Sequence, residues 1–265
     1  MKADYHMHTS FSYDSDSAPE EMIQAAVKKG LQTICITEHQ DTDFAEPGWD
    51  IDFEQYVPRL QELKDKYSSQ LEILIGMEFG LQTHLSRQCS EFAQKYPFDF
   101  IIGSIHLFDG YDPYYPGYFD DKTDEEGYRR AFEITLENVR NTTDFDVLGH
   151  IDYIVRYGHH QEQDYTYAKY ADYLDEIMKH LIQNGKGLEV NTGGWKYGLP
   201  FAHPHQDTLK RYKELGGEII TVGSDAHKPE HVAYDFHKIK DYLEFCGFKY
   251  YTEFRQRKPY FCAIC

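Results

Sequence analysis

The chain has 265 residues, with 27 basic and 45 acidic side chains, so its formal net charge at pH 7 is −18. Hydrophobic residues make up 41% of the sequence and aromatic residues 16%, which is enough for a large buried core and excludes a disordered chain. The acidic balance argues against a nucleic-acid partner, and no apolar run approaches the roughly 18 residues of a membrane span.

Short apolar runs alternate with longer amphipathic stretches along the whole chain. The runs predict strands over 3–7, 32–37, 71–76, 98–103, 144–149, 187–191 and 218–223. The amphipathic stretches predict helices over 19–29, 52–67, 84–95, 124–139, 166–184, 207–215 and 229–245. This alternation predicts an α/β fold with a parallel sheet, open or closed into a barrel, in a single domain spanning 1–265.

Four long loops follow predicted strands, at 40–51, 107–123, 151–165 and 192–206. In a parallel barrel, such loops lie on the C-terminal face, where active sites are found. Five scattered cysteines show no disulfide framework, and the N-terminal residues lack an apolar signal core, so we expect a cytoplasmic protein. Cys262 and Cys265 are interpreted as part of a tail with two thiols.

Each predicted strand ends at side chains that can bind metal. In chain order these are His6 and His8, Glu38 and His39, Glu78, His106, His150, Glu189 and Asn191, and Asp225 and His227. Side chains two residues apart on a strand point to the same face, so His6 and His8 form a natural chelate. Imidazoles and carboxylates converging on one face predict a multinuclear site, and nitrogen and oxygen donors without thiolate suit Zn, Fe or Mn.

The order of these motifs resembles that of the polymerase and histidinol phosphatase (PHP) family. The motifs are D-x-H-x-H at 4–8, E-H at 38–39, G-x-E at 76–78, G-S-x-H at 103–106, G-H-x-D at 149–152 and G-S-D-A-H at 223–227. The opening segment 4–22, and 149–153 followed by Arg156, are similar to the monofunctional histidinol-phosphate phosphatase branch. The resemblance implies a distorted seven-stranded (β/α) TIM-like barrel with a trinuclear metal centre at its C-terminal mouth.

The resemblance also implies a ligand set for two to three divalent metal ions. The first metal would take His6, His8, Glu78 and Asp225, the second Glu78, His106 and His150, and the third Asp14, His39 and His227. Asp16 is a nearby alternative to Asp14. Some family members have histidine at the Asp14 position, and an oxygen ligand there favours Mn or Fe over Zn.

The implied reaction is hydrolysis of a small anionic phosphate monoester, with L-histidinol phosphate of histidine biosynthesis as the expected substrate. The attacking group would be a hydroxide bridged by two metals, so Glu78 and Asp225 would be catalytic through the ions they hold. Arg156 is expected to bind phosphate, with Lys196 as a weaker contact where the family often carries arginine. His39 and Asp152 are the candidates for the acid that protonates the leaving group.

Other residues are expected to support the site. Asp4, Glu38 and Asn191 would orient ligands or merely cap strand ends. The loop carrying Asp109, Asp112, Asp120 and Asp121, with tyrosines at 111, 114, 115 and 118, could favour a cationic amine and stack an imidazole, or could simply be a solvated loop.

Alternative functions remain open from the sequence. A nuclease or nucleotide phosphatase of the family would need a basic groove or a platform on which bases stack, whereas this chain is acidic. The opening motif of the family's protein-tyrosine phosphatases resembles the opening segment of this sequence less. A binding module with a degenerate metal centre would show gaps, whereas every ligand position here is filled. The sequence does not predict the oligomeric state.

Overall fold

The computed structural model describes residues 1–45 and 48–264, and within them seven strands form one parallel sheet. The strands are β1 (Ala3–Asp4), β2 (Thr33–Gln40), β3 (Glu72–Gly80), β4 (Phe100–Ser104), β5 (Val147–Leu148), β6 (Gly187–Asn191) and β7 (Ile220–Gly223). Their spatial order is their order along the chain. Nearly all their residues are buried, as expected for a parallel sheet with both faces covered.

The sheet is almost closed, because the segment that starts at β1 contacts both β2 and β7. Ala3 pairs with Thr33 of β2, while the backbone N–H of Tyr5 donates to the carbonyl oxygen of Val222 in β7 at 2.9 Å. The predicted distorted (β/α) barrel is therefore confirmed. Because parallel strands in a barrel all end on one face, this closure brings the seven strand ends together.

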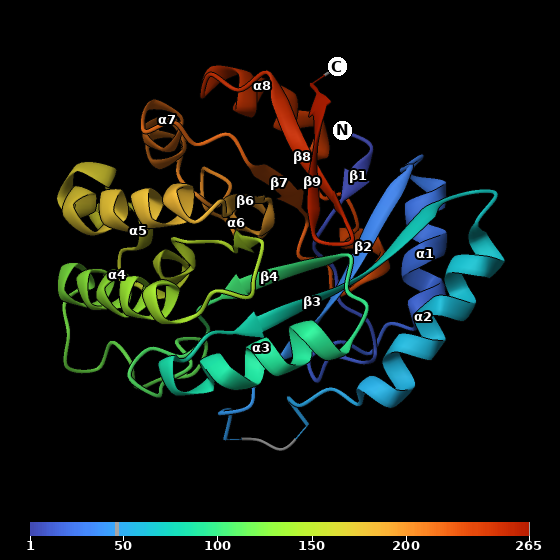
Figure 1. Cartoon of the computed structure of the whole chain (residues 1–265). Coiled ribbons are helices and arrows are strands. Elements are labelled where there is room, and N and C mark those ends of the chain that lie inside the picture. The colour runs from blue at the N-terminus through green and yellow to red at the C-terminus, as the bar shows by residue number, and fades with distance from the viewer. Residues whose placement is uncertain (46–47, 265) are drawn as a thin grey trace.

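Helices surround the strands (Figure 1). They are α1 (Pro19–Lys28), α2 (Phe53–Tyr67), α3 (Ser86–Lys95), α4 (Asp124–Asn141), α5 (Ala171–Gln183), α6 (Gly193–Lys196), α7 (Gln206–Glu214) and α8 (Ile239–Phe245). Local chemistry sets their ends. At α4, for example, Thr123 and Glu126 form a capping box. Among the described residues, no helix combines the length and the apolar character needed to cross a bilayer.

Two predicted helices are shorter than the sequence pattern indicated. The stretch 166–184 begins as a 3₁₀ turn, Tyr167–Tyr170, before α5. The stretch 229–245 consists of two 3₁₀ turns, Pro229–His231 and Phe236–Lys238, followed by α8. Ala233 and Asp235 have positive φ angles of 49° and 53°, which an α-helix cannot accommodate.

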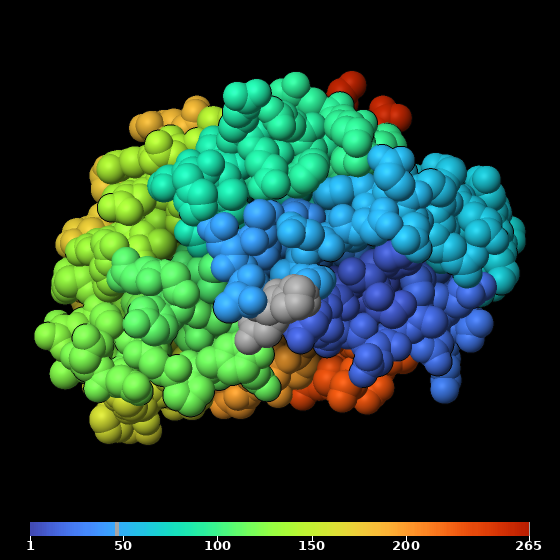
Figure 2. Space-filling view, turned by 90° about the horizontal axis from the view of Figure 1, so that it is seen from below, coloured from blue at the N-terminus to red at the C-terminus, as the bar shows by residue number. Residues whose placement is uncertain are grey.

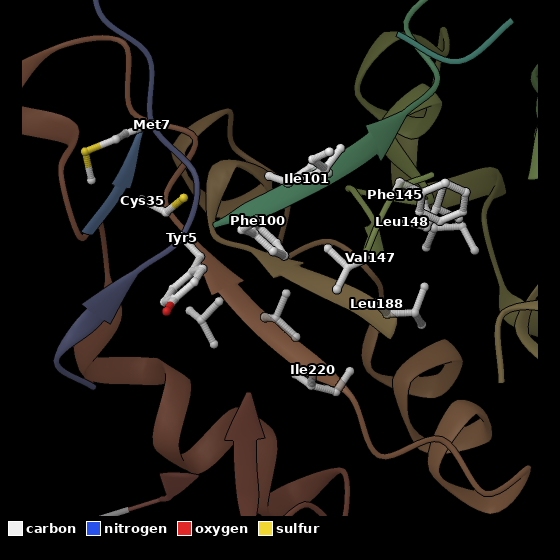
Figure 3. Close-up of a cluster of buried hydrophobic side chains, with 14 of the residues drawn as sticks. Tyr5, Met7, Cys35, Phe100, Ile101, Phe145, Val147, Leu148, Leu188 and Ile220 are labelled. Carbon is white, nitrogen blue, oxygen red and sulfur yellow. The ribbon is translucent and has the colours of Figure 1, made fainter. Parts of the chain in front are cut away.

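Aromatic and aliphatic side chains fill the interior of the barrel. Figure 3 shows Tyr5, Cys35, Phe100 and Val147 among the buried side chains of this cluster. The rings of Tyr5 and Phe100 meet edge to face, with centroids 5.3 Å apart. This packing makes the barrel a solid core rather than a channel, so the strand ends above it are held rigidly.

The C-terminal segment is not the tail that the sequence suggested. Residues Tyr250–Arg255 (β8) and Lys258–Ala263 (β9) form an antiparallel hairpin, with Cys262 in β9; Cys265 lies outside the described residues. Its tip reaches the starts of two barrel strands. The backbone N–H of Arg257 donates to the carbonyl of Asp99, and Arg257 Nε lies 2.5 Å from Asp146 Oδ2. The hairpin therefore covers the end of the barrel opposite the strand ends that carry the histidines.

Replacing Phe254 with alanine is expected to lower the free energy of unfolding by about 3–5 kcal/mol. Phe254 is 3% exposed, its ring packs 5.1 Å from that of Phe100, and its backbone N–H and C=O both bond the Tyr5 hydroxyl. Urea denaturation measures the change. Phe261→Ala on the same hairpin is the control, since Phe261 is 52% exposed and its loss should cost less than about 0.5 kcal/mol. Equal losses of stability in the two variants would contradict a stabilising role for the buried Phe254 ring.

The four loops expected on the C-terminal face do gather there. Phe44 and Trp49 follow β2, Tyr114 follows β4, Arg156 follows β5 and Tyr197 follows β6, and all of them line one cavity. Figure 2 shows the segments after β2 (blue) and after β4 (green) meeting on the surface. The long loops therefore form the walls of a site at the strand ends.

Candidate metal centre

The strand ends bring together the imidazoles and carboxylates singled out in the sequence. They are His6, His8, Asp14, His39, Glu78, His106, His150, Asp225 and His227. Register explains part of this grouping, because His39 of β2 lies directly beside Glu78 of β3 in the parallel ladder. The segment after β7 contributes in the same way, since the N–H of Asp225 donates to the carbonyl of His6 at 2.8 Å.

Glu78 lies at the centre of the cluster and is fully buried. Its Oε2 atom lies 3.0 Å from His6 Nε2 and 3.4 Å from His8 Nε2. Its Oε1 atom lies 3.0 Å from His150 Nε2 and 3.3 Å from His106 Nε2. The two carboxylate oxygens thus face separate sets of imidazoles, with His39 Nδ1 also 3.3 Å from Oε2. This is an arrangement suited to a carboxylate that bridges two metal ions.

The far nitrogens of these imidazoles are held by other side chains. His6 Nδ1 lies 2.6 Å from Glu189 Oε1, His8 Nδ1 lies 3.2 Å from Ser12 Oγ, and His106 Nδ1 lies 3.0 Å from Asp41 Oδ1. Such contacts orient a histidine so that its other nitrogen is presented to a metal. The Nε2 atoms of all three rings accordingly point toward Glu78.

A second, more open group lies at the edge of the cluster. Asp14 Oδ2 is 3.0 Å from His227 Nε2 and 3.6 Å from His39 Nε2. Although partial burial opposes ionisation, the neighbouring imidazoles of His39 and His227 hold the pKa of Asp14 well below its usual range. Asp14 is 37% exposed and therefore faces the cavity as a carboxylate.

Asp225 links the two groups. Its Oδ1 atom lies 3.7 Å from His8 Nε2 and 3.6 Å from His227 Nδ1. Its φ angle is +54°, a left-handed conformation that aspartate tolerates better than most residues. Burial opposes its ionisation, but His6 and the nearby Lys196 hold the pKa of Asp225 well below its ordinary value.

The donor set fits divalent metal ions. The Nε2 atoms of His6 and His8 are buried only 3.1 Å apart, so two ring N–H groups cannot both point into that space. His39 Nδ1 is buried without a hydrogen-bond partner among the described residues, although Asp41 and Glu78 oxygens lie 3.1 and 3.3 Å away. A cation between the His6 and His8 nitrogens removes the first conflict. A metal on His39 Nε2 would leave the hydrogen on Nδ1, where the Asp41 and Glu78 oxygens can accept it. Nitrogen and oxygen donors suit Zn, Mn or Fe.

Above the cluster lies a cavity of 570 Å³. Its floor includes Glu78, His106 and His150, and its walls are rich in tyrosine. Arg156, Lys228 and His231 add basic groups to its lining. The cavity has the size of a small-molecule site, and its charges suit a ligand with an anionic end.

Arg156 lies in the cavity wall with only 6% of its side chain exposed. Its guanidinium carbon lies 5.0 Å from the ring centre of Tyr153 and 4.7 Å from that of Tyr197. Nη2 is buried without a hydrogen-bond partner among the described residues and lies 3.6 Å from Asp225 Oδ2. A buried, incompletely bonded guanidinium beside a metal ligand is suited to bind an oxyanion.

Asp152 and Lys196 do not line this cavity. Asp152 is fully buried and bonds His203 Nδ1 and the N–H of His205, and although burial opposes ionisation, His203 holds its pKa below the usual value. This geometry does not favour Asp152 as a proton donor. Lys196 Nζ donates to the backbone carbonyl of Asp225 at 2.5 Å, so this contact occupies one of its three N–H donors.

The three residues expected to support the site bond both the backbone and the side chains around the ligands. Asn191 Nδ2 lies 3.5 Å from His6 Nδ1 and donates to Asp225 Oδ2 at 3.4 Å. Asp4 accepts the N–H groups of Ser224 and Ala233, and Asn191 Oδ1 accepts the N–H of Gly193. Glu38 accepts bonds from Thr9 and from Ser12 Oγ, and so reaches His8 through Ser12. Burial raises the pKa of Glu38 to about 7.

Sequence reasoning missed Asp41. It is 3% exposed, bonds His106 Nδ1 and lies 3.1 Å from His39 Nδ1. The available signal was its position two residues after His39, because alternate residues of a strand share a face. Gly80 makes room for it, since a Cβ there would lie 1.7 Å from Asp41 Oδ1.

Together, the barrel and the paired imidazole groups around one carboxylate define a metal-dependent α/β-barrel hydrolase site. Residues 4–193 match the model of the PHP domain, and the chain belongs to the PHP domain family. The resemblance stated from the sequence motifs is therefore confirmed.

Named relatives extend this match along the chain. The chain is 30% identical to a histidinol-phosphatase of Lactococcus lactis over 254 residues, which cover 93% of this chain and 92% of that protein. It is 34% identical to a probable histidinol-phosphatase of Clostridium acetobutylicum, covering 94% and 95%.

A solved structure agrees with these relatives. It is that of histidinol phosphate phosphatase from Lactococcus lactis in complex with zinc, L-histidinol and phosphate. The TM-score is 0.88 at 31% identity, with 98% of each chain covered. The putative histidinol phosphatase of Listeria monocytogenes shares the fold, with a TM-score of 0.76 at 20% identity, covering 89% of this chain and 99% of that one.

Proposed function

We propose that this protein is a metal-dependent phosphatase that hydrolyses L-histidinol phosphate to L-histidinol and phosphate. The observation that carries the proposal is the bridging position of Glu78 between two pairs of imidazoles. The Lactococcus lactis protein whose structure holds zinc, L-histidinol and phosphate is similar to this chain over almost its whole length, which supports the choice of substrate.

The grouping of the side chains supports the ligand set that the family resemblance implies. His6, His8 and Asp225 would hold one ion with Glu78, and His106 and His150 a second. Asp14, His39 and His227 would hold a third. When bound, divalent ions neutralise phosphate charge and lower the pKa of water toward 7.

Arg156 would bind the phosphate group from the cavity wall. Its position 3.6 Å from Asp225 places the guanidinium at the edge of the metal centre rather than at the mouth. There it would meet phosphate oxygens that also face the ions, and its planar fork would fix their orientation.

The mouth of the cavity would receive the leaving group. Asp112, Tyr114 and Tyr115 lie in its lining, where a carboxylate and aromatic rings suit a molecule with an amine and an imidazole. The rest of this loop serves structure, since Asp109 pairs with Arg130 and the hydroxyl of Tyr118 bonds the carbonyl of Gly127.

Phosphate release from L-histidinol phosphate tests the proposal. The protein is loaded with Mn or Zn and assayed beside nucleotide, sugar and tyrosine phosphates. We expect turnover of histidinol phosphate to exceed that of the other esters, to fall to background after chelation, and to return when metal is restored.

The other outcomes are equally informative. Chelator-sensitive turnover of nucleotides or phosphotyrosine in preference to histidinol phosphate would replace the substrate but keep the metal centre. Turnover that survives complete metal removal would contradict the metal mechanism. Bound metal without turnover of any ester would favour a binding module.

A further inference from the structure

Three polar side chains form a chain of hydrogen bonds behind the cavity wall. Asp152 Oδ1 lies 2.5 Å from His203 Nδ1, and Arg156 Nε donates to His203 Nε2 at 2.9 Å. Asp152 and His203 are both fully buried, and only Arg156 reaches the cavity. These hydrogen bonds therefore connect Asp152 and His203, which a ligand in the cavity cannot touch, with Arg156, which it can.

The chain of bonds permits only one tautomer of His203. Arg156 can only donate, so His203 Nε2 must carry a lone pair and Nδ1 must carry the hydrogen. The carboxylate of Asp152 accepts that hydrogen, and its other oxygen is fixed by the N–H of His205 at 2.7 Å. Burial and the charge of Arg156 lower the pKa of His203 to about 4, in keeping with a neutral ring.

The guanidinium is held on its other sides as well. Tyr153 and Tyr197 lie over it, and a Cβ on Gly193 would come within 2.5 Å of Nη2. Its Nε–H is directed to His203, whereas Nη2 is buried with no hydrogen-bond partner in the described part of the chain. A buried donor is costly unless a ligand satisfies it, so Nη2 is the edge offered to an anion.

We propose that His203, held in one tautomer by Asp152, is a positioning residue that sets the orientation of Arg156 for binding phosphate. This inference rests on the proposed function, in which Arg156 binds the phosphate group. It gives Asp152 a role in binding rather than in proton transfer, and it assigns a role to the H-P-H segment at 203–205. His203 acts only through Arg156, so its effect must vanish when Arg156 is absent.

The first test measures binding of inorganic phosphate to the zinc-loaded protein by calorimetry. His203→Leu removes the acceptor for Arg156 Nε and is expected to weaken phosphate binding about 10-fold, the effect of losing one hydrogen bond to a charged group. His203→Gln keeps an acceptor and a donor in the chain and should recover most of that loss. In steady-state assays the same loss should appear mainly in KM, with zinc content unchanged.

Asp152→Asn provides a second variant that keeps His203 and its packing. The asparagine amide would donate to His203 Nδ1, which forces the hydrogen onto Nε2, opposite the N–H of Arg156. We expect it to weaken phosphate binding about as much as His203→Leu does. His180→Gln on α5, outside the cavity lining, is the matched control for histidine replacement and should leave phosphate binding unchanged.

A double-mutant cycle with Arg156→Ala decides between positioning and general structural support. If His203 acts through Arg156, His203→Leu and Asp152→Asn cause no further loss in the Arg156→Ala background. Additive losses there, or unchanged phosphate binding in both single variants, would overturn the proposal. Because the cycle measures binding of inorganic phosphate, it tests the role of His203 even if the protein does not hydrolyse L-histidinol phosphate. A lack of hydrolysis would refute the proposed function but not the role of His203.

Discussion

Replacing Glu78 with glutamine is expected to lower turnover of L-histidinol phosphate by about 10³-fold or more. The side chain is the only one of the described cluster whose two oxygens face two separate pairs of imidazoles. An amide keeps the shape but offers one neutral oxygen, so it would bind the ions more weakly and could not bridge them, and the charge stabilisation that bound ions give to phosphate would be lost. Charge stabilisation by metal ions is worth several kcal/mol, and each 1.36 kcal/mol corresponds to a factor of ten in rate.

Metal content, measured together with kcat, shows whether Glu78→Gln loses activity because it binds less metal. We expect Glu78→Gln to retain less metal than the parent protein, with little change in the far-ultraviolet spectrum. Glu72→Gln is the matched control, because Glu72 lies on the same strand, β3, but pairs with Arg255 at the opposite end. A Glu78→Gln protein with full metal and more than a tenth of parental activity would argue against the bridging role.

Removing the Arg156 side chain is expected to lower kcat/KM about 100-fold, mostly through KM. Charged contacts that are buried together are worth about 2–5 kcal/mol when one partner is removed. Arg156→Lys should recover part of the loss, since it restores the charge without the planar fork. Product inhibition by phosphate should weaken in parallel with the rise in KM.

The chain offers a close control for this substitution. Arg129 on α4 also lies near two tyrosine rings. Its guanidinium carbon is 5.8 Å from the ring centres of Tyr170 and Tyr173, but Arg129 is outside the cavity lining. Arg129→Ala removes the same contacts at a surface position and should leave kcat/KM within about twofold, as for most surface changes. Equal losses for the two arginines would mean that Arg156 supports the fold rather than the substrate.

The alternation of apolar runs and amphipathic stretches predicted the parallel α/β fold, and the resemblance to the PHP family supplied the closed barrel and the ligand set. Buried parallel strands are short apolar runs, and their ends all lie on the same face, so a residue such as Glu78 or His150 is located by its place in the motif.

The roles that the sequence did not predict correctly depend on the direction in which a side chain points. Lys196 and Asp152 both lie near the centre, but one is directed to a backbone carbonyl and the other to His203. Asp41 was missed because its role depends on the space left by Gly80 on the neighbouring strand. The β8–β9 hairpin was missed because its turn, Gln256 and Arg257, has positive φ angles without the glycine or asparagine that usually marks such turns.

That hairpin has a consequence for how the protein is made. The bonds between the Tyr5 hydroxyl and Phe254 join residues 249 positions apart, and the Arg257 turn ties down the starts of β4 and β5. During synthesis the end of the barrel that the hairpin covers therefore stays open until residue 257 has emerged. Contacts of such long sequence separation form slowly, and apolar surface that is exposed in the meantime promotes aggregation, so we expect refolding of this protein to be slow and sensitive to its concentration.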